Sequence, residues 1–350
     1  MYNIRDLKRK LNKLKKQIEF VRFCMSHGYD EWFTGEVKKL GVAKNRVEVV
    51  TYGEEQDKVL YHIYIPKTYS GFFANYNRVL AYLYFSDQHH LTPVVEYDRE
   101  TMYAEENPVN GSSNPFEYYF DQPGGVSLDE MKKSGTVLAA LRENSWLVNE
   151  LEEVSVNYVH SERFVSEMGR IVKSYIRLNE PVKRYLMQQK AQLLGEKSVL
   201  GVHVRGTDFK QNYNGHPVFI PVEEFLQQAV KMMDQGKYDR IFLATDDLNA
   251  VEQFQAVFGE KLVYYDDVIR SNGEVTVMKS DLSRKNHHYL LGLEVLRDMM
   301  TLADCDGFLA GLSQVSYAVR FQKESYGRKF RDLEILYKGT NEHTNRNCPK

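Results

Sequence analysis

The feature that most constrains the fold is a regular alternation of short apolar runs and amphipathic segments after residue 195. Each run has the length and composition of a buried strand, and each following segment repeats its apolar residues with a helical period. The expected strands are 199–204, 240–244, 262–265 and 307–310, and the expected helices are 221–236, 248–258, 288–303 and one that begins at Ser313. Such alternation predicts a doubly wound α/β sheet.

The first half of the chain predicts a second α/β unit. A strand at 59–65, a helix at 73–86 and a strand at 92–97 form a βαβ unit, which implies a parallel strand pair. Other helical patterns fill 128–142 and 160–194. The chain has 350 residues, enough for two domains. We expect an amphipathic helix over 1–30, an N-terminal α/β domain over 31–194 and a C-terminal Rossmann-like domain over 195–350, whose last helix and tail pack back on the N-terminal domain.

Polar residues lie at and just after the end of the predicted strand 199–204, the first strand in the second half of the chain. His203, Arg205, Thr207 and Asp208 cluster there, and Gly206 interrupts them. In open α/β sheets, ligands bind outside the carboxyl ends of the strands. A guanidinium at that place suits a phosphate ester or a diphosphate, because its planar fork can bind two oxygens. An ordinary ion pair between Arg205 and Asp208 is the alternative, and this stretch does not decide between the two.

Three further features lie at the same edge of the predicted sheet. Asp246 follows the second strand, Asp298 lies inside the third helix, and 311–316 forms a strand-to-helix turn. Ser313 in this turn can cap the last helix, so that the first backbone N–H groups and the positive dipole end point outward. A diphosphate could bridge this helix start and Arg205 without a metal ion.

The N-terminal half adds a glycine turn and an aromatic island. The turn at 70–75 opens a helix at a sheet edge, where free backbone N–H groups favour anions. The segment 104–126 is rich in Asn, Pro, Gly and Ser and contains the aromatic run 116–120. Aromatic rings among polar residues suit stacking on sugar rings, and packing as core beneath a loop is an equal alternative.

Composition argues against several classes of protein. The net charge of -2 and an average apolar content disfavour disorder and general binding to nucleic acid. The cysteines, Cys24, Cys305 and Cys348, show neither CxxC spacing nor an even count, which argues against disulfides and a zinc site. The acidic pairs are interpreted as caps and turns rather than metal ligands. Because there is no signal-peptide pattern and no long apolar run, we expect a cytoplasmic protein.

The segment 4–25 repeats its apolar residues at alternating spacings of three and four, which is typical of a coiled-coil seam or of a helix laid on a partner. The repeating residues are Ile4, Leu7, Leu11, Leu14, Ile18, Val21 and Met25, and basic residues cover the other faces. Docking on the chain's own body, homodimerisation and contact with an anionic membrane are the alternatives, and the sequence does not separate them.

Over 60–325 the chain resembles the fucosyltransferases that use GDP-fucose, specifically the α1,6 type of animal N-glycan core fucosylation and of the rhizobial nodulation enzymes. The resemblance is carried by 201–208, 221–225 and 244–247, and by 298–316 with Asp306 and Ser313 in place. It implies the GT-B fold, in which two Rossmann-like domains face a cleft. It also implies an inverting transfer of L-fucose from GDP-fucose to a sugar hydroxyl of a glycan, without a cofactor or a metal ion.

The resemblance implies roles for individual residues. Arg205 is implied to hold the β-phosphate, while His203 and Asp298 bracket the guanine and the Asp298 carboxylate accepts hydrogen bonds from the base. The other residues expected to contact GDP-fucose are Gly71, Phe72, Asn75, Tyr103, Asp246, Ser313, Gln314 and Val315. The donor site is therefore expected to draw on both domains.

Two departures from the family leave the catalytic base open. Gly206 stands where the core-fucosylating members have a second consecutive arginine, and the loop 209–220 lacks the glutamate that these members carry as a candidate base. We rank Asp208 first as the base and His216 second, while Arg205 stabilises the leaving group. Asp208 could equally orient Arg205.

Two other functions stay open on the sequence alone. One is a GT-B glycosyltransferase that uses another nucleotide sugar, and the other is a non-catalytic scaffold protein that binds GDP. The glycan acceptor cannot be read from the sequence. We expect a bacterial-like cytoplasmic enzyme, placed at the inner face of the membrane if the segment 4–25 binds lipid.

Overall fold

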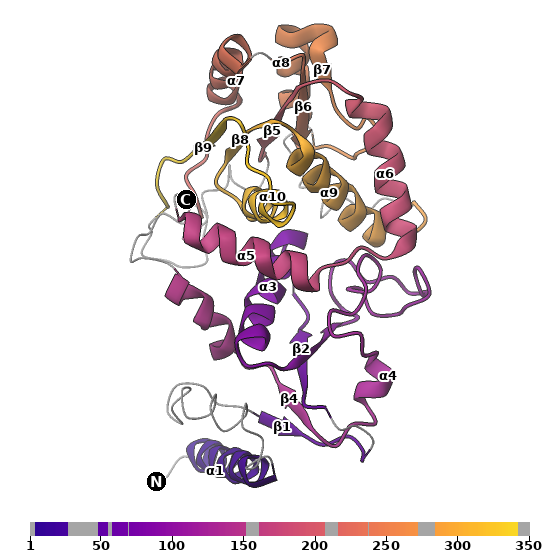
Figure 1. The fold of residues 1–350 in the computed structure, drawn as a ribbon, viewed down its shortest axis with the longest axis vertical. Helices are drawn as coiled ribbons and strands as arrows, with labels where there is room; N and C mark the ends of the chain where they lie inside the picture. The colour runs from indigo at the N-terminus through magenta and orange to yellow at the C-terminus, as the bar shows by residue number, and fades with distance from the viewer. Residues whose placement is uncertain are drawn as a thin grey trace.

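The structure is a computed structural model that describes residues 4–26, 48–54, 58–68, 70–151, 161–206, 216–236, 238–271 and 284–341. Two β-sheets follow one another along the long axis of an elongated molecule, and helices separate and cover them (Figure 1).

The second half of the chain forms a five-stranded sheet, here called the C-terminal sheet, in the order β7-β6-β5-β8-β9, with every strand pair parallel. Its strands are β5 (Val199–Val204), β6 (Arg240–Thr245), β7 (Leu262–Val263), β8 (Gly307–Gly311) and β9 (Leu333–Leu336). The four predicted strands are confirmed. The edge strand β9 was not predicted, because its residues are only partly buried and do not form an apolar run.

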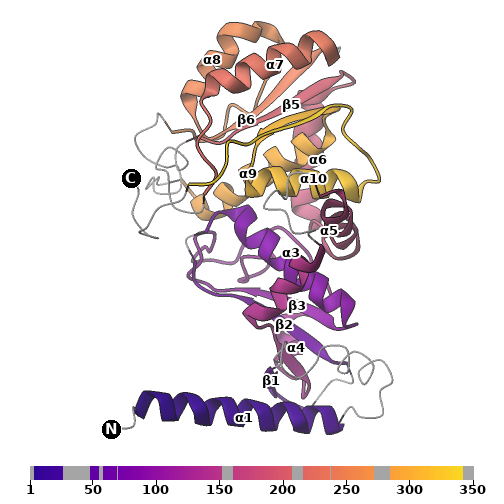
Figure 2. The same cartoon turned by 90° about the vertical axis from the view of Figure 1, so that its left-hand side faces the viewer.

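Helices cover both faces of the C-terminal sheet (Figure 2). They are α7 (Val222–Gly236), α8 (Leu248–Phe258) with the short 3-10 turn η4 (Gly259–Lys261), α9 (His287–Asp304) and α10 (Gln314–Ser325). Alternate residues of β5 enter two different cores, since Leu200 and Val202 pack with α7 and α8 whereas Val199 packs with α9 and α10. The predicted doubly wound arrangement is confirmed.

The first half of the chain forms a four-stranded sheet, here called the N-terminal sheet, in the order β1-β4-β2-β3. Its strands are β1 (Glu48–Val50), β2 (Leu60–Ile65), β3 (Thr92–Tyr97) and β4 (Val137–Ala139). As predicted, β2 and β3 are parallel and α3 (Phe72–Gln88) connects them. The edge strand β1 runs antiparallel to β4, so this sheet is mixed.

The predicted helix over 128–142 is wrong. The segment contains only the short helix α4 (Leu128–Met131), then β4, and the 3-10 helix η1 (Arg142–Leu151) begins at its end. Leu60 N donates to Thr136 O at 3.0 Å, and β4 then pairs with β2. Pairing with the sheet therefore overrides the helical pattern of the segment, since propensity is only a weak prior.

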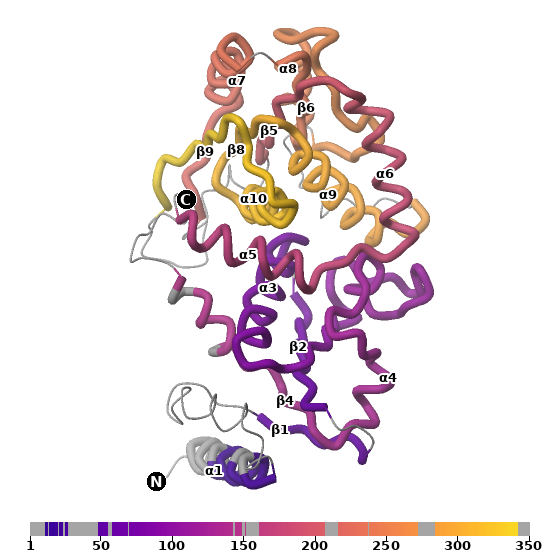
Figure 3. Tube along the Cα trace, viewed as in Figure 1, coloured from indigo at the N-terminus to yellow at the C-terminus, as the bar shows by residue number. Residues whose placement is uncertain are grey.

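Two helices connect the half of the chain that forms the N-terminal sheet to the half that forms the C-terminal sheet, as the trace in Figure 3 shows. α5 (Glu162–Tyr175) packs on α10 and α3, and α6 (Glu180–Leu194) packs on α9. The predicted helix over 160–194 is therefore two helices. It breaks where Leu178 pairs with Phe120 in an isolated bridge and Asn179 caps α6 by accepting from Val182 N at 3.1 Å.

A helix, α1 (Ile4–Ser26), lies across one end of the molecule and contacts β1 (Figure 2). Phe23 is buried, and Lys16 Nζ donates to Glu48 Oε2 at 2.6 Å. Within the described ranges, no helix is long and apolar enough to cross a membrane.

Candidate active site

The carboxyl ends of β5, β6 and β8 meet at one edge of the C-terminal sheet, here called the carboxyl edge. His203 of β5 is in register with Ala244 of β6 on one side and with Ala310 of β8 on the other. Arg205 lies two residues after His203, and Asp246 lies two residues after Ala244. The predicted convergence of Arg205, Asp246 and the start of α10 is therefore set by parallel pairing.

Asp246 holds Arg205 in place. Arg205 Nη1 donates to Asp246 Oδ2 at 3.0 Å, and Gly206 N donates to Asp246 Oδ1 at 2.8 Å. Both side chains are about one quarter exposed or less, so this ion pair is partly screened from water. Asp208, the partner considered from the sequence, lies outside the described residues. Asp246 was predicted to contact the donor, and in the structure it orients the arginine.

Gly206 is required by close packing. A Cβ atom at this position would lie 2.7 Å from Asp247 Cβ and 2.9 Å from Asp246 Oδ1. Asp247 itself is buried and caps α8, because its carboxylate accepts from Asn249 N at 3.0 Å. The tight contact with Asp246 and Asp247 explains why a glycine, rather than a second arginine, follows Arg205.

The start of α10 is a capped helix N-terminus at the same edge. Ser313 Oγ accepts from Ser316 N at 3.1 Å, and Ser313 N donates to Ser316 Oγ at 2.9 Å. Both the backbone N–H and the hydroxyl oxygen of Ser313 are therefore engaged in the cap. Within the part of the chain that the structure describes, the backbone N–H groups of Gln314 and Val315 have no acceptor. These two groups and the positive helix end remain for a ligand.

The second turn of α3 contacts the start of α10. Asn77 Nδ2 donates to Gln314 O at 3.0 Å and to Gln314 Oε1 at 2.8 Å. α3 begins after Gly71, which provides no side-chain cap. Asn75 is fully buried, and its Oδ1 has no hydrogen-bond partner among the described residues. The first turns of α3, from the N-terminal half of the chain, therefore lie beside the start of α10 at the carboxyl edge.

Tyr103 and Phe72 lie on the N-terminal side of this edge. The two rings meet edge to face, 5.4 Å apart, and both are buried. Burial raises the pKa of the Tyr103 hydroxyl well above its usual range, and the nearby charge of Arg205 acts in the opposite direction. Arg205 therefore lies within electrostatic reach of Tyr103. The predicted contacts of both rings with a nucleotide stay predictions.

Asp298 is a buried carboxyl on α9. Burial raises its pKa to about 7, although Arg297 and Arg270 act in the opposite direction. His203, the other residue predicted at the base, is also buried, in β5, and α9 packs on β5. At neutral pH the Asp298 carboxyl is thus poised between its two protonation states.

A network around Arg297 was not predicted. The Arg297 guanidinium is almost fully buried, lies 3.9 Å from the centroid of the Tyr265 ring, and donates to Tyr185 OH at 2.7 Å. It pairs with both oxygens of Asp267. Arg270 Nη2 donates to Tyr265 O at 2.7 Å, so a second arginine is fixed near Asp298. The sequence pattern does not show which distant residues pair with Arg297.

A second unpredicted cluster lies one helical turn before Asp298. Arg284 forms a two-pronged ion pair with Glu294, with contacts of 2.6 and 3.1 Å, and its Nε donates to His287 Nδ1 at 3.0 Å. Glu294 and His287 are both buried. This cluster fixes the first part of α9, whose next turns carry Asp298.

The aromatic island is core. Phe116, Tyr118, Tyr119 and Phe120 are at most 3% exposed, so their rings cannot stack on a sugar in this conformation. Tyr119 OH donates to Tyr289 O at 2.9 Å and joins the island to α9. The sugar-stacking alternative is therefore wrong, and the core alternative is confirmed.

His216, the second candidate base, is exposed, and its backbone carbonyl accepts from Asn341 N at 2.9 Å. In the described ranges, no group of three or more His, Cys, Asp or Glu side chains could hold a metal ion. The acidic residues that the sequence paired serve the chain itself, since Asp306 Oδ2 accepts from Val199 N at 2.9 Å and Asp304 pairs with Lys190.

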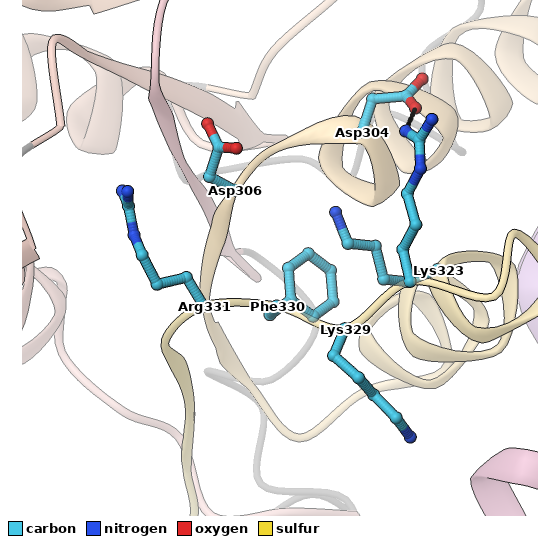
Figure 4. A pocket seen from close by; sticks show the side chains of 7 residues that line it. Asp304, Asp306, Lys323, Lys329, Phe330 and Arg331 are labelled. Atoms are coloured by element: carbon cyan, nitrogen blue, oxygen red, sulfur yellow. Dashed lines mark ion pairs between the residues drawn. The ribbon is translucent and has the colours of Figure 1, made fainter.

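A cavity of about 650 Å³ lies at the opposite edge of the C-terminal sheet, here called the amino edge (Figure 4). Its lining residues are Asp304, Asp306, Lys323, Arg328, Lys329, Phe330 and Arg331. The cations are already engaged, since Lys323 Nζ donates to Cys305 O at 2.7 Å and Lys329 pairs with Glu324 at 2.7 Å. Ligands of parallel sheets bind at the carboxyl ends of strands, so we do not place the active site in this cavity.

A doubly wound sheet with an arginine and a helix start at its carboxyl edge defines an α/β protein of the nucleotide-binding type. Residues 148–323, about half of the chain, match the family model described as alpha-(1,6)-fucosyltransferase N- and catalytic domains. The chain belongs to this family, and it is an enzyme, a fucosyltransferase.

Several solved structures are similar to the chain at low identity. The NodZ alpha-1,6-fucosyltransferase soaked with GDP-fucose is 15% identical over 76% of this chain and 93% of its own, with a TM-score of 0.44. Fucosyltransferase NodZ from Bradyrhizobium is 15% identical over 77% and 92%, with a TM-score of 0.44. POFUT1 in complex with GDP is 12% identical over 80% and 99%, with a TM-score of 0.47. No curated protein sequence matches the chain.

Proposed function

We propose that this fucosyltransferase transfers L-fucose from GDP-fucose to a hydroxyl group of a glycan, forming an α1,6 linkage with inversion and without a metal ion. The observation that carries the proposal is the Arg205 guanidinium, which Asp246 fixes at the carboxyl edge where α10 and α3 begin. GDP is named as the carrier because relatives of this fold were solved with GDP-fucose or GDP.

The chemistry requires stabilisation of the departing diphosphate. Fucose that is β-linked in the donor and α-linked in the product has been inverted, so a single displacement suffices. Negative charge develops on the leaving oxygen in the transition state. A fixed guanidinium and the amide groups of Gln314 and Val315 oppose that charge without reorganising. This set of charges and dipoles supplies the role that a divalent cation has in other transferases.

Recognition of guanine is assigned to Asp298 and His203. An ionised carboxylate can accept two hydrogen bonds, from the N1–H and the exocyclic amine of guanine, whereas adenine offers no such pair of donors. The positive charges of Arg297 and Arg270 act to lower the pKa of Asp298 and so favour its ionised form. Binding of guanine adds two donors and shifts the same equilibrium further.

The acceptor hydroxyl must lose a proton. Asp208 is proposed as the general base, since it follows Arg205 by three residues, and His216 is the second candidate. Gly71, Phe72, Asn75 and Tyr103 are proposed to form the N-terminal wall of a cleft between two domains that holds the donor. A glycan would enter from that side. We place the reaction in the cytoplasm.

The proposal is tested by donor and acceptor screening. The protein is incubated with GDP-fucose, GDP-mannose or ADP-heptose and a panel of glycans, and nucleotide release is measured with and without chelator. We expect release with GDP-fucose only, dependence on an acceptor, no effect of chelator, and an α-linked product by NMR. Transfer from another donor would contradict the GDP-fucose assignment. GDP binding without any turnover would indicate a scaffold protein instead.

A further inference from the structure

The helix α1 presents an apolar seam to solvent. Leu11, Leu14, Ile18, Val21 and Met25 are between 47 and 75% exposed. Their alternating spacing of three and four places them in one line along the helix. A continuous line of exposed aliphatic side chains is unusual for a soluble protein and marks a surface that binds something.

The opposite face of α1 attaches the helix to the rest of the chain. Phe23 is 4% exposed, and Lys16 pairs with Glu48 beside β1. These two residues lie seven apart and on the side of the helix away from the seam. Because α1 docks through this side, the exposed seam residues face away from the described elements that α1 contacts. The helix does dock on the chain, as one alternative from the sequence has it, but through the face opposite the seam.

The position of α1 favours a flat partner. The helix lies across the long axis at the very end of the molecule, and the other described elements all lie on one side of it (Figure 2). Its outward side could therefore touch a plane along several turns without hindrance from the described sheets and helices.

The charge of α1 selects among partners. The stretch 4–26 contains eight Lys and Arg residues and two acidic residues, a net charge of +6, although the whole chain carries -2. Lys8, Lys10, Lys15 and Arg22 hold the positions that flank the seam, and in a coiled coil these positions face the partner helix. A second copy would set cations against cations. An anionic surface would meet them with opposite charge.

We propose that α1 binds anionic phospholipid membranes, lying in the plane of the interface with the seam residues among the acyl chains and the flanking cations at the headgroups. This inference rests on α1 alone and does not depend on the proposed transfer reaction. It places the enzyme on a membrane surface through a helix separate from the carboxyl edge.

Flotation of the full chain with vesicles tests this. One set is phosphatidylcholine, and the other contains about one third phosphatidylglycerol. We expect the apparent partition coefficient to be about tenfold or more higher for the anionic vesicles. Salt of about 1 M, where the Debye length is about 3 Å, should remove most of that difference. Equal binding to both vesicles, or none, would overturn the proposal.

Substitutions test whether the seam and its flanking cations, rather than another surface, bind the membrane. The double substitution Leu14→Asp with Ile18→Asp, and separately Lys15→Glu with Arg22→Glu, should reduce binding to the level of neutral vesicles. The control is Met187→Asp, which changes a residue on α6 that is 60% exposed and should leave binding unchanged. Thermal unfolding verifies that each variant is folded. If the seam variant still binds, or if it converts a dimer into a monomer in light scattering, the membrane assignment is wrong.

Discussion

At the carboxyl edge of the C-terminal sheet, Arg205 and Asp246 lie where α10 begins, whereas at the amino edge Lys323 and Asp304 lie where α10 and α9 end. Both edges therefore combine basic and acidic side chains. The helix ends that meet them have opposite polarity, because a helix carries partial positive charge at its N-terminus and partial negative charge at its C-terminus.

This difference decides which edge can bind an anion. At the amino edge the cations compensate helix C-termini, as Lys323 does by donating to Cys305 O just beyond α9. Arg331 and Lys329 point away from each other there (Figure 4). At the carboxyl edge Arg205 adds to the positive end of α10. The cavity of about 650 Å³ thus lies at the edge where Lys323 and Lys329 already have partners within the chain.

Removing one arginine from each edge tests whether the two edges differ in function. Arg205→Ala should lower kcat/KM by about 10³ or more, because a preorganised charge is lost at the leaving group. Arg331→Ala should change kcat/KM by less than about twofold. Steady-state kinetics with GDP-fucose and thermal unfolding of both variants measure this. Equal losses at the two edges would show that the polarity of helix ends does not select the site.

A smaller effect is expected from Gly206→Ala. The new methyl group would press on Asp246 and Asp247, at 2.9 and 2.7 Å, and displace the carboxylate that holds Arg205. We expect kcat to fall by about ten- to a hundredfold, since a small misplacement of a catalytic group is costly. Thermal unfolding checks that this variant is folded. Unchanged kcat for Gly206→Ala would contradict the positioning role of Asp246.

The pH dependence of GDP binding tests Asp298. Its pKa in the free protein is raised to about 7, and guanine binds the ionised form, so affinity should be constant above about pH 7 and fall about tenfold per pH unit below it. Asp298→Asn should abolish this slope. Because the pKa of Asp298 is higher in the folded protein than its ordinary value of 3.8, this group stabilises the folded state fully below pH 3.8. That stabilisation is lost as the pH rises through about 7. Calorimetric titration at several pH values gives the slope, and an unaltered slope in the variant would refute the assignment.

We expect the smallest effect on activity from a substitution at the amino edge. Lys323→Met keeps the length of the side chain but loses the hydrogen bond to Cys305 O and the contact with the Phe330 ring, whose centroid lies 4.7 Å from Nζ. We expect a loss of about 1–2 kcal/mol in the free energy of unfolding, with kcat within about twofold. Lys329→Met, at an exposed ion pair, should cost less than about 0.5 kcal/mol. A large loss of activity in the Lys323 variant would place function at this edge.

The sequence predicted the parts of the site that depend on strand order. Parallel pairing brings Arg205, Asp246 and the start of α10 together, and the periods of 199–204, 240–244 and 307–310 were sufficient to predict that pairing. The sequence also indicated Ser313 as a cap, and the structure confirms it.

Contacts between distant segments could not be predicted in this way. Asp246 was not predicted as a partner of Arg205, because contacts across neighbouring strands depend on register and side-chain direction. The Arg297 network needs Tyr185 from a helix more than a hundred residues earlier. The aromatic island was ambiguous, since burial beneath α9 depends on how the two sheets pack.

The central claim is that Arg205 and the start of α10 hold the diphosphate, and the most direct test compares the affinities of GDP and guanosine for the wild type and for Arg205→Ala. Guanosine serves as the internal control for a folded base site. We predict that the preference for GDP over guanosine falls by about ten- to a hundredfold in the variant, as expected for lost charge-assisted hydrogen bonds, while guanosine affinity stays the same. An unchanged preference for GDP would contradict the account.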